Sequence, residues 1–321
     1  MQNTTNDRRE FLKTSLKAGV VLGLSGVLGS LSANTTNSQG VKMQFSTLNN
    51  GVKMPMLGIG TLNMGNTKEV QNAIESALEV GYRLIDTAQR YGTEEGVGAG
   101  IKSSGIKREE IFITTKLRPS LTNEKDALKA FEGSLKNLQT DYVDLFLLHW
   151  PLNDTYGAWR VMSKLHKEGR IKAIGVCNFL PDRIVDFCLN NEIKPAINQV
   201  ECNPLYQRAN LQKVMQEYNV KLESWASFGQ GRSGVLDNPV LMSIAKKHNK
   251  SVAQVILRWL IERDIIVIPK TTRKERMLEN INIFDFKLDE NDKTAIAKLD
   301  KGVSLSFNQQ DVERVKWLNS L

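Results

Sequence analysis

The chain of 321 residues has few of the residues that define small disulfide-rich or zinc-binding proteins. It contains three histidines and three cysteines, Cys177, Cys188 and Cys202. These cysteines are too few and too far apart for a zinc knuckle or a disulfide framework, so at most one disulfide can form. With 41% apolar and 24% charged residues, the chain has enough material for a large buried core, and disorder is not expected as its main state.

The chain also lacks a concentrated block of positive charge. Its net charge is +8, but lysines and arginines are spread along the sequence, and clusters such as Arg273, Lys274 and Arg276 stay local. The sequence therefore argues against nucleic-acid binding.

The N-terminal segment contains an apolar run that is too short for a typical membrane span. The uncharged stretch from Ala18 to Ala33 includes four glycines, whereas roughly 20 apolar residues are needed to cross a bilayer. It follows the sequence Arg-Arg-Glu-Phe-Leu-Lys, which begins at Arg8 and resembles a twin-arginine export signal. We predict a signal peptide over residues 1–33 and a short linker over 34–42.

The predicted signal implies that the twin-arginine translocation machinery is a partner and that the protein is periplasmic. Cleavage after Ala33 is expected, and an uncleaved membrane anchor is the alternative. Because this pathway carries folded proteins, the signal is also consistent with a cofactor acquired before export.

Residues 43–321 alternate between apolar strands and amphipathic helices. A hairpin is expected from Met43 to Met54 around the turn at Asn49, Asn50 and Gly51, and helical periods cover Val70 to Val80 and Glu124 to Leu138. Eight further strands are predicted over 57–62, 83–87, 111–116, 143–150, 173–177, 196–202, 221–226 and 265–270. Eight such units in about 280 residues predict an α/β fold, a (β/α)8 TIM barrel with the N-terminal hairpin at its base.

A doubly wound sheet is the alternative fold. It requires a glycine-rich turn after an early strand and an acidic residue about 20 positions later. Neither Gly58-Ile59-Gly60 nor the glycines from Gly96 to Gly100 meet this requirement. The second group lies in a predicted helix, where glycine permits close packing.

Polar side chains recur where the predicted strands end. A single such residue is usually structural, but a barrel brings the ends of all its strands to one rim, where enzymes with this fold place their active sites. The six residues are Asp86, Lys116, His149 and Lys270 at strand ends, Asn178 just after a strand, and Gln199 on a strand. A metal site is the competing interpretation, but His166 and His248 fall on predicted helices and leave one imidazole at the rim, so we predict no metal.

Several motifs that contain these residues resemble those of the aldo-keto reductases. The similarity extends from Gln44 to Leu321 and is closest to the bacterial diketogluconate-reductase-like members. It rests on Asp86-Thr87-Ala88 with Tyr91, Thr115-Lys116, Leu148-His149-Trp150-Pro151, the segment 175–179, Asn198-Gln199-Val200-Glu201, Glu223-Ser224-Trp225, Gly229-Gln230-Gly231 and Ile268-Pro269-Lys270. The resemblance implies a monomeric, NADPH-dependent enzyme that reduces an aldehyde or a ketone to an alcohol.

The resemblance implies a catalytic tetrad of Asp86, Tyr91, Lys116 and His149. Tyr91 is expected to donate the proton, which requires its pKa to fall from about 10 toward neutrality. A lysine ammonium about 4 Å away favours the phenolate, so Lys116 is expected to lower that pKa. Asp86 would orient Lys116, and His149 would donate a hydrogen bond to the substrate oxygen.

The resemblance also implies the cofactor contacts. At the nicotinamide end these are Asp86, Cys177, Asn178 and Gln199, with the ring stacked on Trp225, and Cys177 stands where a serine is usual and hydrogen-bonds weakly. The segment Gly229-Gln230-Gly231 would contact the pyrophosphate, because its two glycines permit close approach of the backbone. At the adenosine end, Lys270, Thr271 and Arg276 would contact the 2′-phosphate, and Glu279 and Asn280 would contact the adenine.

The expected substrate pocket includes Leu62, Asn63, Trp150 and Leu152 and the segment 306–309 in a short, polar C-terminal tail. Leu62 stands where an aromatic residue is common among relatives, so the entrance should be open. Small aldehydes, α-keto or diketo compounds and short sugars all suit such a pocket. The alternative function is an exported nucleotide-binding barrel that acts as a redox sensor or accessory subunit with little turnover.

Overall fold

A computed structural model describes residues 35–36, 42–231 and 234–320. The predicted signal peptide and most of the predicted linker lie outside these residues. The ends of the linker form a short antiparallel pair, in which β1 (Thr35–Thr36) pairs with β2 (Lys42–Met43). Among the described residues, no helix has the length and apolar character needed to cross a bilayer.

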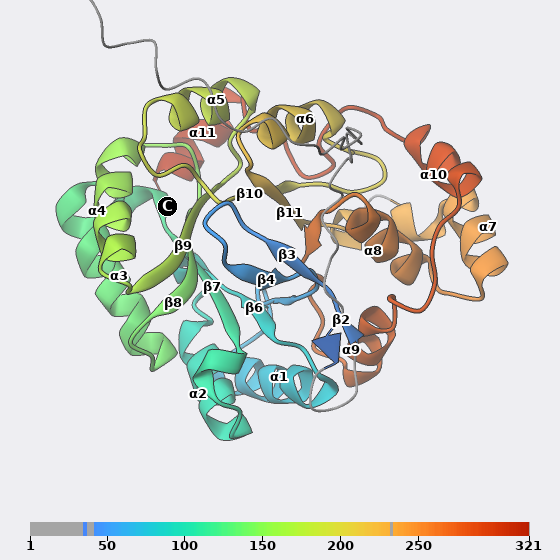
Figure 1. Ribbon diagram of the computed structural model, residues 1–321, viewed down its shortest axis with the longest axis horizontal. Helices are drawn as coiled ribbons and strands as arrows, with labels where there is room; N and C mark the ends of the chain where they lie inside the picture. Colours follow the sequence, from blue (N-terminus) through green and yellow to red (C-terminus); the bar gives the residue numbers. More distant parts are fainter. Residues whose placement is uncertain (1–34, 37–41, 232–233, 321) are drawn as a thin grey trace, which may run out of the picture. The chain divides into compact units, whose positions relative to one another are not determined.

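Eight parallel strands form the centre of the unit that begins at Ser32 (Figure 1). They are β5 (Ile59–Gly60), β6 (Leu84–Asp86), β7 (Phe112–Leu117), β8 (Val143–Leu148), β9 (Ile171–Cys177), β10 (Ile197–Glu201), β11 (Lys221–Trp225) and β12 (Ile266–Val267). Each strand pairs with the next in sequence, and a parallel bridge between Leu57 and Val267 closes the first strand onto the last. The predicted (β/α)8 barrel is therefore confirmed.

Helices surround this barrel (Figure 1). They are α1 (Thr67–Val80), α2 (Glu94–Ser104), α3 (Glu124–Leu138), α4 (Thr155–Lys167), α5 (Pro181–Leu189), α6 (Ala209–Glu217), α7 (Pro239–His248), α8 (Val252–Glu262), α9 (Lys274–Ile281), α10 (Glu290–Ala297) and α11 (Val312–Asn319). The last strand, β12, is shorter than predicted, because Pro269 has no N–H for the ladder and Lys270 lies beyond the strand's end.

The predicted hairpin closes the base of the barrel. Its strands are β3 (Phe45–Thr47) and β4 (Lys53–Pro55), and Gly51 in the turn has a φ of 86°, which glycine adopts readily. The side-chain amides of Asn49 and Asn50 donate to the carbonyl oxygens of Pro195 and Lys172, near the beginnings of β10 and β9. The hairpin therefore lies at the end of the barrel opposite the rim.

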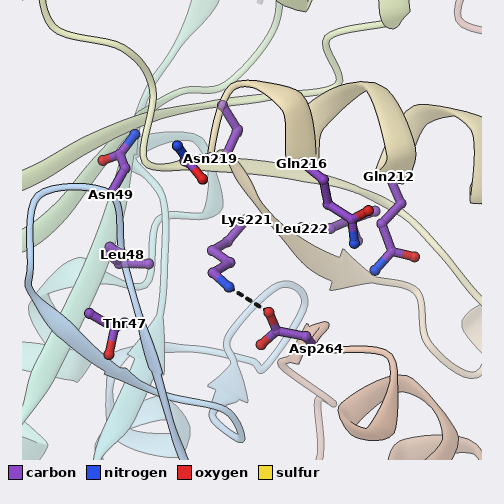
Figure 2. A pocket seen from close by; sticks show the side chains of 10 residues that line it. Thr47, Leu48, Asn49, Gln212, Gln216, Asn219, Lys221, Leu222 and Asp264 are labelled. Atoms are coloured by element: carbon purple, nitrogen blue, oxygen red, sulfur yellow. Dashed lines mark hydrogen bonds and ion pairs between the residues drawn. The ribbon is translucent and has the colours of Figure 1, made fainter. Parts of the chain in front are cut away.

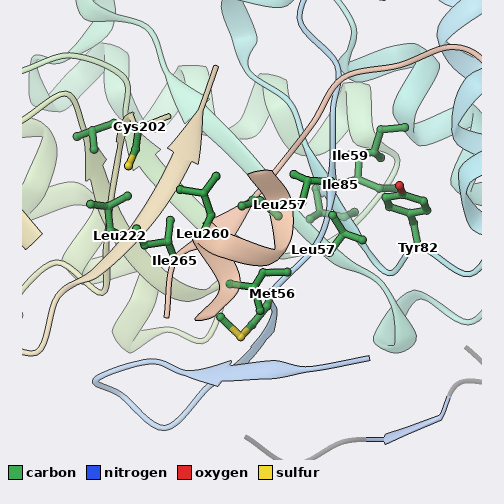
Figure 3. Packing of buried hydrophobic residues seen from close by; sticks show 14 of the residues in the cluster. Met56, Leu57, Ile59, Tyr82, Ile85, Cys202, Leu222, Leu257, Leu260 and Ile265 are labelled. Carbon is green, nitrogen blue, oxygen red and sulfur yellow. The ribbon is translucent and has the colours of Figure 1, made fainter. Parts of the chain in front are cut away.

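Two apolar clusters hold the fold together. The smaller fills the barrel interior and includes Leu84, Leu145 and Ile197 from the strands with Leu48 and Met54 from the hairpin. The larger lies between the strands and the helices, and part of it is drawn in Figure 3, where Leu57, Ile59 and Ile85 of the strand region lie near Leu257 and Leu260 of α8. Inward and outward side chains alternate along the strands, as the fold requires.

Glycines let α2 pack closely against its neighbours. A Cβ on Gly96 or Gly100 would meet residues of α1, and a Cβ on Gly98 would meet the backbone of Asn137 and Leu138 in α3 at 2.6–2.8 Å. The predicted packing role of these glycines is confirmed.

Candidate active site at the barrel rim

The polar residues predicted at strand ends come together at one end of the barrel. Asp86 is the last residue of β6, Lys116 is the penultimate residue of β7, and His149 directly follows β8. Asn178 follows β9, and Gln199 lies within β10. Since the strands are parallel, all five lie toward the C-terminal rim.

A buried ion pair lies at the centre of the site. The Nζ of Lys116 is 2.5 Å from Oδ1 of Asp86 and donates to the carbonyl oxygen of Thr87 at 2.9 Å. Burial lowers the pKa of Lys116, but the negative charge of Asp86 and its hydrogen bond to the ammonium oppose this, and the pKa is raised overall. Burial also raises the pKa of Asp86, partly opposed by Lys116. Lys116 therefore keeps its proton, and its ammonium is held in one place.

A short turn places Tyr91 over this ion pair. Tyr91 ends the 3-10 turn η1 (Gln89–Tyr91), which Gly92 terminates with a φ of 65°. The hydroxyl of Thr93 contacts the hydroxyls of Thr87 and Thr61 at 2.8 and 3.0 Å and ties the turn to the strand ends. As a result, Nζ of Lys116 donates to the hydroxyl of Tyr91 at 3.5 Å.

The expectation that Lys116 brings the pKa of Tyr91 toward neutrality is wrong for this structure. Burial raises the pKa of Tyr91, Lys116 lowers it, and the negative charge of Asp86 raises it again, which leaves a pKa of about 12. Desolvation of the phenolate outweighs the attraction of one ammonium whose charge Asp86 already offsets. Tyr91 is therefore protonated at neutral pH.

His149 faces Tyr91 across the rim. Their ring centroids are 5.6 Å apart in an edge-on arrangement. Burial, with the nearby charges of Lys116 and Arg90, lowers the pKa of His149 well below 6.5, so the imidazole is neutral. Its Nδ1 is buried without a hydrogen-bond partner among the described residues. A neutral imidazole still carries one N–H that can be donated to an oxygen.

Two amide side chains next to the ion pair have well-defined partners. Asn178 donates to the carbonyl oxygen of His149 at 3.1 Å and accepts from Nε1 of Trp225 at 2.9 Å. Gln199 donates to Oδ2 of Asp86 at 2.8 Å and to Oε2 of Glu223 at 2.9 Å. Both N–H groups of Gln199 are therefore already used, and its carbonyl oxygen is left to accept a hydrogen bond.

The cysteines are all free thiols. Cys177 is fully buried among the residues of the barrel interior, and burial raises its pKa well above 9. Its predicted contact with a carboxamide stays a prediction.

The residues predicted to bind the adenosine phosphate lie after β12. Lys270 and Arg276 are exposed, and neither forms an ion pair within the described ranges. Thr271 is buried and its hydroxyl accepts from the backbone N–H of Arg273, which precedes α9. Glu279 and Asn280 lie in the same helix. Two unpaired cations beside a helix start suit a phosphate group in charge and geometry.

The predicted pyrophosphate segment is a left-handed turn. Gly229, Gln230 and Gly231 have φ values of 58°, 57° and 69°. Apart from its chain neighbours, no atom of the described residues lies within 4 Å of the position that a Cβ of Gly231 would occupy. Residues 232 and 233, which follow this turn in the sequence, lie outside the described part of the chain.

The C-terminal tail differs from the expected short polar segment. Phe307 lies 5.7 Å from Trp150 between ring centroids, Leu318 is buried, and residues 312–319 form α11. Oε2 of Glu201, at the end of β10, accepts from the hydroxyl of Ser304 at 2.5 Å, and Oε1 accepts from the backbone N–H of Leu305 at 2.9 Å. The tail is thus anchored at a strand end and reaches the rim.

The rest of the predicted substrate pocket lies at the same rim. Leu62, which follows β5, is 43% exposed, Asn63 beside it is exposed, and Leu152 follows Trp150. Arg90 and Arg314 both lie over the ring of Trp317, at 5.0 and 4.8 Å. Sequence reasoning missed Arg90, Arg314 and Trp317, because no pattern of spacing connects residue 90 with the tail.

A separate polar cavity of about 250 Å³ lies at the base of the barrel, away from these residues (Figure 2). Thr47 and Asn49 of the hairpin region line it together with Gln212 and Gln216 of α6, and Lys221 and Asp264 pair across it at 2.5 Å. In the part of the chain that the structure describes, no group of three or more His, Cys, Asp or Glu side chains is arranged to hold a metal.

The fold and the rim together define a class of protein: a (β/α)8 barrel that holds a tyrosine hydroxyl, a buried ammonium and a neutral imidazole in one place. The comparisons with known proteins agree. The chain belongs to the aldo/keto reductase family, whose profile matches residues 56–301, and it is an oxidoreductase.

Three relatives illustrate the similarity. The glyoxal reductase of Bacillus subtilis is 44% identical over 266 residues, which cover 83% of this chain and 96% of that protein. The crystal structure of an aldo/keto reductase from Brucella melitensis has a TM-score of 0.77 and 45% identity, covering 80% of this chain and all of that one. A Bombyx mori aldo-keto reductase in complex with NADP has a TM-score of 0.78 and 34% identity, covering 83% and 95% of the two chains.

Proposed function

We propose that this protein reduces the carbonyl group of an aldehyde or ketone to an alcohol with NADPH, and that Tyr91 donates the proton. The observation that carries the proposal is the contact at 3.5 Å between the hydroxyl of Tyr91 and the ammonium of Lys116, which Asp86 holds in turn. A bound nicotinamide supplies the hydride that goes to the carbonyl carbon.

The source of the proton is the hydroxyl of Tyr91. Its raised pKa keeps the hydroxyl protonated, and an alkoxide is basic enough to take that proton. The phenolate left on Tyr91 is then next to the ammonium of Lys116, which stabilises it. Asp86 and the carbonyl oxygen of Thr87 prevent Lys116 from moving away.

His149 would position the carbonyl for this transfer. The neutral imidazole can donate one hydrogen bond to the substrate oxygen, which would then lie between His149 and Tyr91. Because the ring is uncharged, it does not compete with Tyr91 as the proton source.

NADPH, and not NADH, is the proposed cofactor. Lys270 and Arg276 have no carboxylate partner within the described ranges and would pair with the 2′-phosphate, beside Thr271. The solved structure of the Bombyx mori relative in complex with NADP supports this assignment. The other proposed contacts are Glu279 and Asn280 with the adenine, Gly229, Gln230 and Gly231 with the pyrophosphate, Asn178, Gln199 and Cys177 with the carboxamide, and Trp225 with the nicotinamide ring.

Small aldehydes and dicarbonyl compounds are the proposed substrates. The name of the Bacillus subtilis relative, a glyoxal reductase, supports this class. Trp150, Phe307 and the exposed Leu62 would line the substrate pocket. We also propose that residues 1–33 direct the protein to the periplasm.

The test is a titration of the chain from Asn34 onward with NADPH and NADH and a panel of small aldehydes and keto sugars, followed by nicotinamide absorbance. We expect oxidation of NADPH in preference to NADH. A Tyr91→Phe variant should bind NADPH as the wild type does and lose turnover by roughly 10²–10⁴-fold, the usual contribution of a positioned acid. An unchanged rate would exclude Tyr91 as the donor.

Two other outcomes have separate meanings. Tight binding of NADPH without oxidation by any compound in the panel would support the redox sensor or accessory subunit instead of an active reductase. No binding of either nucleotide would contradict the proposed cofactor.

A further inference from the structure

A second carboxyl group lies in the barrel interior, beyond the four residues of the proposed tetrad. Glu223, in β11, is fully buried and is paired in register with Gln199 on the neighbouring strand β10. Its Oε2 accepts from Nε2 of Gln199 at 2.9 Å, and its Oε1 has no partner among the described residues. A buried carboxyl group costs free energy unless it is well bonded, so its position calls for an explanation.

Glu223 completes a pair of acceptors around one amide nitrogen. Nε2 of Gln199 has two hydrogens, and it donates to Asp86 at 2.8 Å and to Glu223 at 2.9 Å. No hydrogen remains on that nitrogen for a third acceptor. The carbonyl oxygen of Gln199 is the only group of this side chain that can still bind a ligand.

Asn178, in contrast to Gln199, can still donate a hydrogen bond to a ligand. Its oxygen accepts from Trp225 at 2.9 Å, and one of its two amide hydrogens goes to the carbonyl oxygen of His149 at 3.1 Å. The other hydrogen is the one that Asn178 can offer to a ligand. Gln199 therefore accepts and Asn178 donates, which matches the NH2 and the oxygen of a carboxamide.

We propose that Glu223 is a positioning residue that, together with Asp86, fixes the amide of Gln199 as an acceptor for the NH2 of the nicotinamide carboxamide. With Asp86 alone, one N–H would be free, and the amide could rotate and offer that N–H to the ligand. The inference rests on the proposed use of NADPH. It adds a reason for a second buried carboxyl group beside Gln199 in the barrel interior.

The protonation of Glu223 agrees with this role. Burial, followed by the charge of Asp86, raises the pKa of Glu223 to about 8, whereas the hydrogen bond from Gln199 and the charge of Lys116 lower it. Glu223 is thus largely neutral at pH 7, with Oε2 as the acceptor. The charged and titratable groups around it are Asp86, Lys116 and Cys177.

The test compares binding of NADPH with binding of its 3-acetylpyridine analogue, in which a methyl group replaces the carboxamide NH2. Dissociation constants are measured by quenching of protein fluorescence, without substrate. The lost hydrogen bond should weaken analogue binding by roughly 3- to 10-fold in the wild type. In Glu223→Met this ratio should fall below about 2, because the rotated amide can donate to the acetyl oxygen.

Two variants serve as controls for charge and for burial. Glu223→Gln keeps an oxygen acceptor but cannot ionise, so it should retain the ratio of the wild type. Thr114→Val removes a different buried polar group, whose Oγ1 has no partner in the described part of the chain, and should also retain it. Should Glu223→Met fail to fold, Glu223→Ala removes the same acceptor without filling the space.

The outcomes separate the two hypotheses. A wild-type ratio in Glu223→Met or Glu223→Ala would overturn the positioning role of Glu223. If Thr114→Val also lowered the ratio of the two dissociation constants below about 2, the role would be overturned as well, because any disturbance of the interior would then have the same effect. Failure of the wild type to bind NADPH at all would instead contradict the proposed function.

Discussion

At the scale of single residues, the buried ion pair of Lys116 and Asp86 affects both the electrostatics of the site and the stability of the fold. Both side chains are almost completely buried, and their charged atoms lie 2.5 Å apart. Removing one partner of a buried pair leaves a charge without compensation, which costs more than removing both. We therefore expect the contact that would hold Lys116 beside Tyr91 to affect the free energy of unfolding as well.

Lys116→Met should lower the free energy of unfolding by about 3–5 kcal/mol, because the carboxylate of Asp86 is left buried without its cation. The double variant Asp86→Asn with Lys116→Met should recover part of this loss. Urea unfolding of the wild type, both single variants and the double variant gives the coupling energy. Additive effects of the two substitutions would show that the pair does not stabilise the fold.

The sequence was enough to predict where the residues of the site lie, but not their pKa values. The strand ends at Asp86, Lys116 and His149 could be found from apolar runs that stop at a polar residue. The pKa of Tyr91 could not, because it depends on burial and on Asp86 offsetting Lys116, and both are set by the packed structure. The commitment of Gln199 to two carboxyl groups likewise depends on the register of β10 and β11.

At the scale of elements, α2 shows how glycine spacing sets the distance between helices. Replacing Gly98 by alanine would put a Cβ within 2.6–2.8 Å of backbone atoms in the last turn of α3, which cannot move aside as a side chain can. We expect Gly98→Ala to lower the free energy of unfolding by about 1–3 kcal/mol. Thermal and urea unfolding measure the change.

Gly133 in α3 provides the matched control. It is exposed, and outside its own helix no atom of the described residues lies within 4 Å of the position of its missing Cβ. Gly133→Ala should therefore raise the free energy of unfolding by roughly 0.5–1 kcal/mol, through helix propensity alone. Equal effects of the two substitutions would mean that the contact of α2 with α3 is not tight.

Capping residues fix where helices begin, and apolar periodicity alone placed one of two predicted starts too late. The helix expected from Val70 begins three residues earlier, at Thr67, because Asn66 and Glu69 form a reciprocal capping box. The helix over 124–138 has the predicted bounds, with Asn123 as its cap. Helix α11 was not predicted, because its stability depends on burial of Leu318 against the barrel, which local sequence does not encode.

At the scale of the whole molecule, the interior carboxyl groups make stability depend on pH. The pKa of Glu223 is about 8 in the folded protein, because burial and then Asp86 raise it from its ordinary value of 4.5. The folded state therefore holds a proton that the unfolded state releases between these values. The contribution of Glu223 to stability is complete below about pH 4.5 and is lost as the pH rises through 8.

Glu223→Gln cannot release this proton. Its free energy of unfolding, relative to the wild type, should be higher at pH 8.5 than at pH 5.5, and urea unfolding at both values tests this. Thr114→Val, which changes no titrating group, should follow the wild-type dependence on pH. A constant difference between Glu223→Gln and the wild type would contradict the raised pKa.

The anchoring of the tail at Glu201 has a consequence for protein engineering. Ser304 and Leu305 are bonded to the end of a barrel strand, whereas Phe307 and α11 lie further along the chain. The anchor divides the tail into a fixed stem and an exchangeable end. Pocket linings from other barrels can be grafted after Ser306 with the stem retained, so that new specificity is introduced without disturbing the strand that carries Gln199.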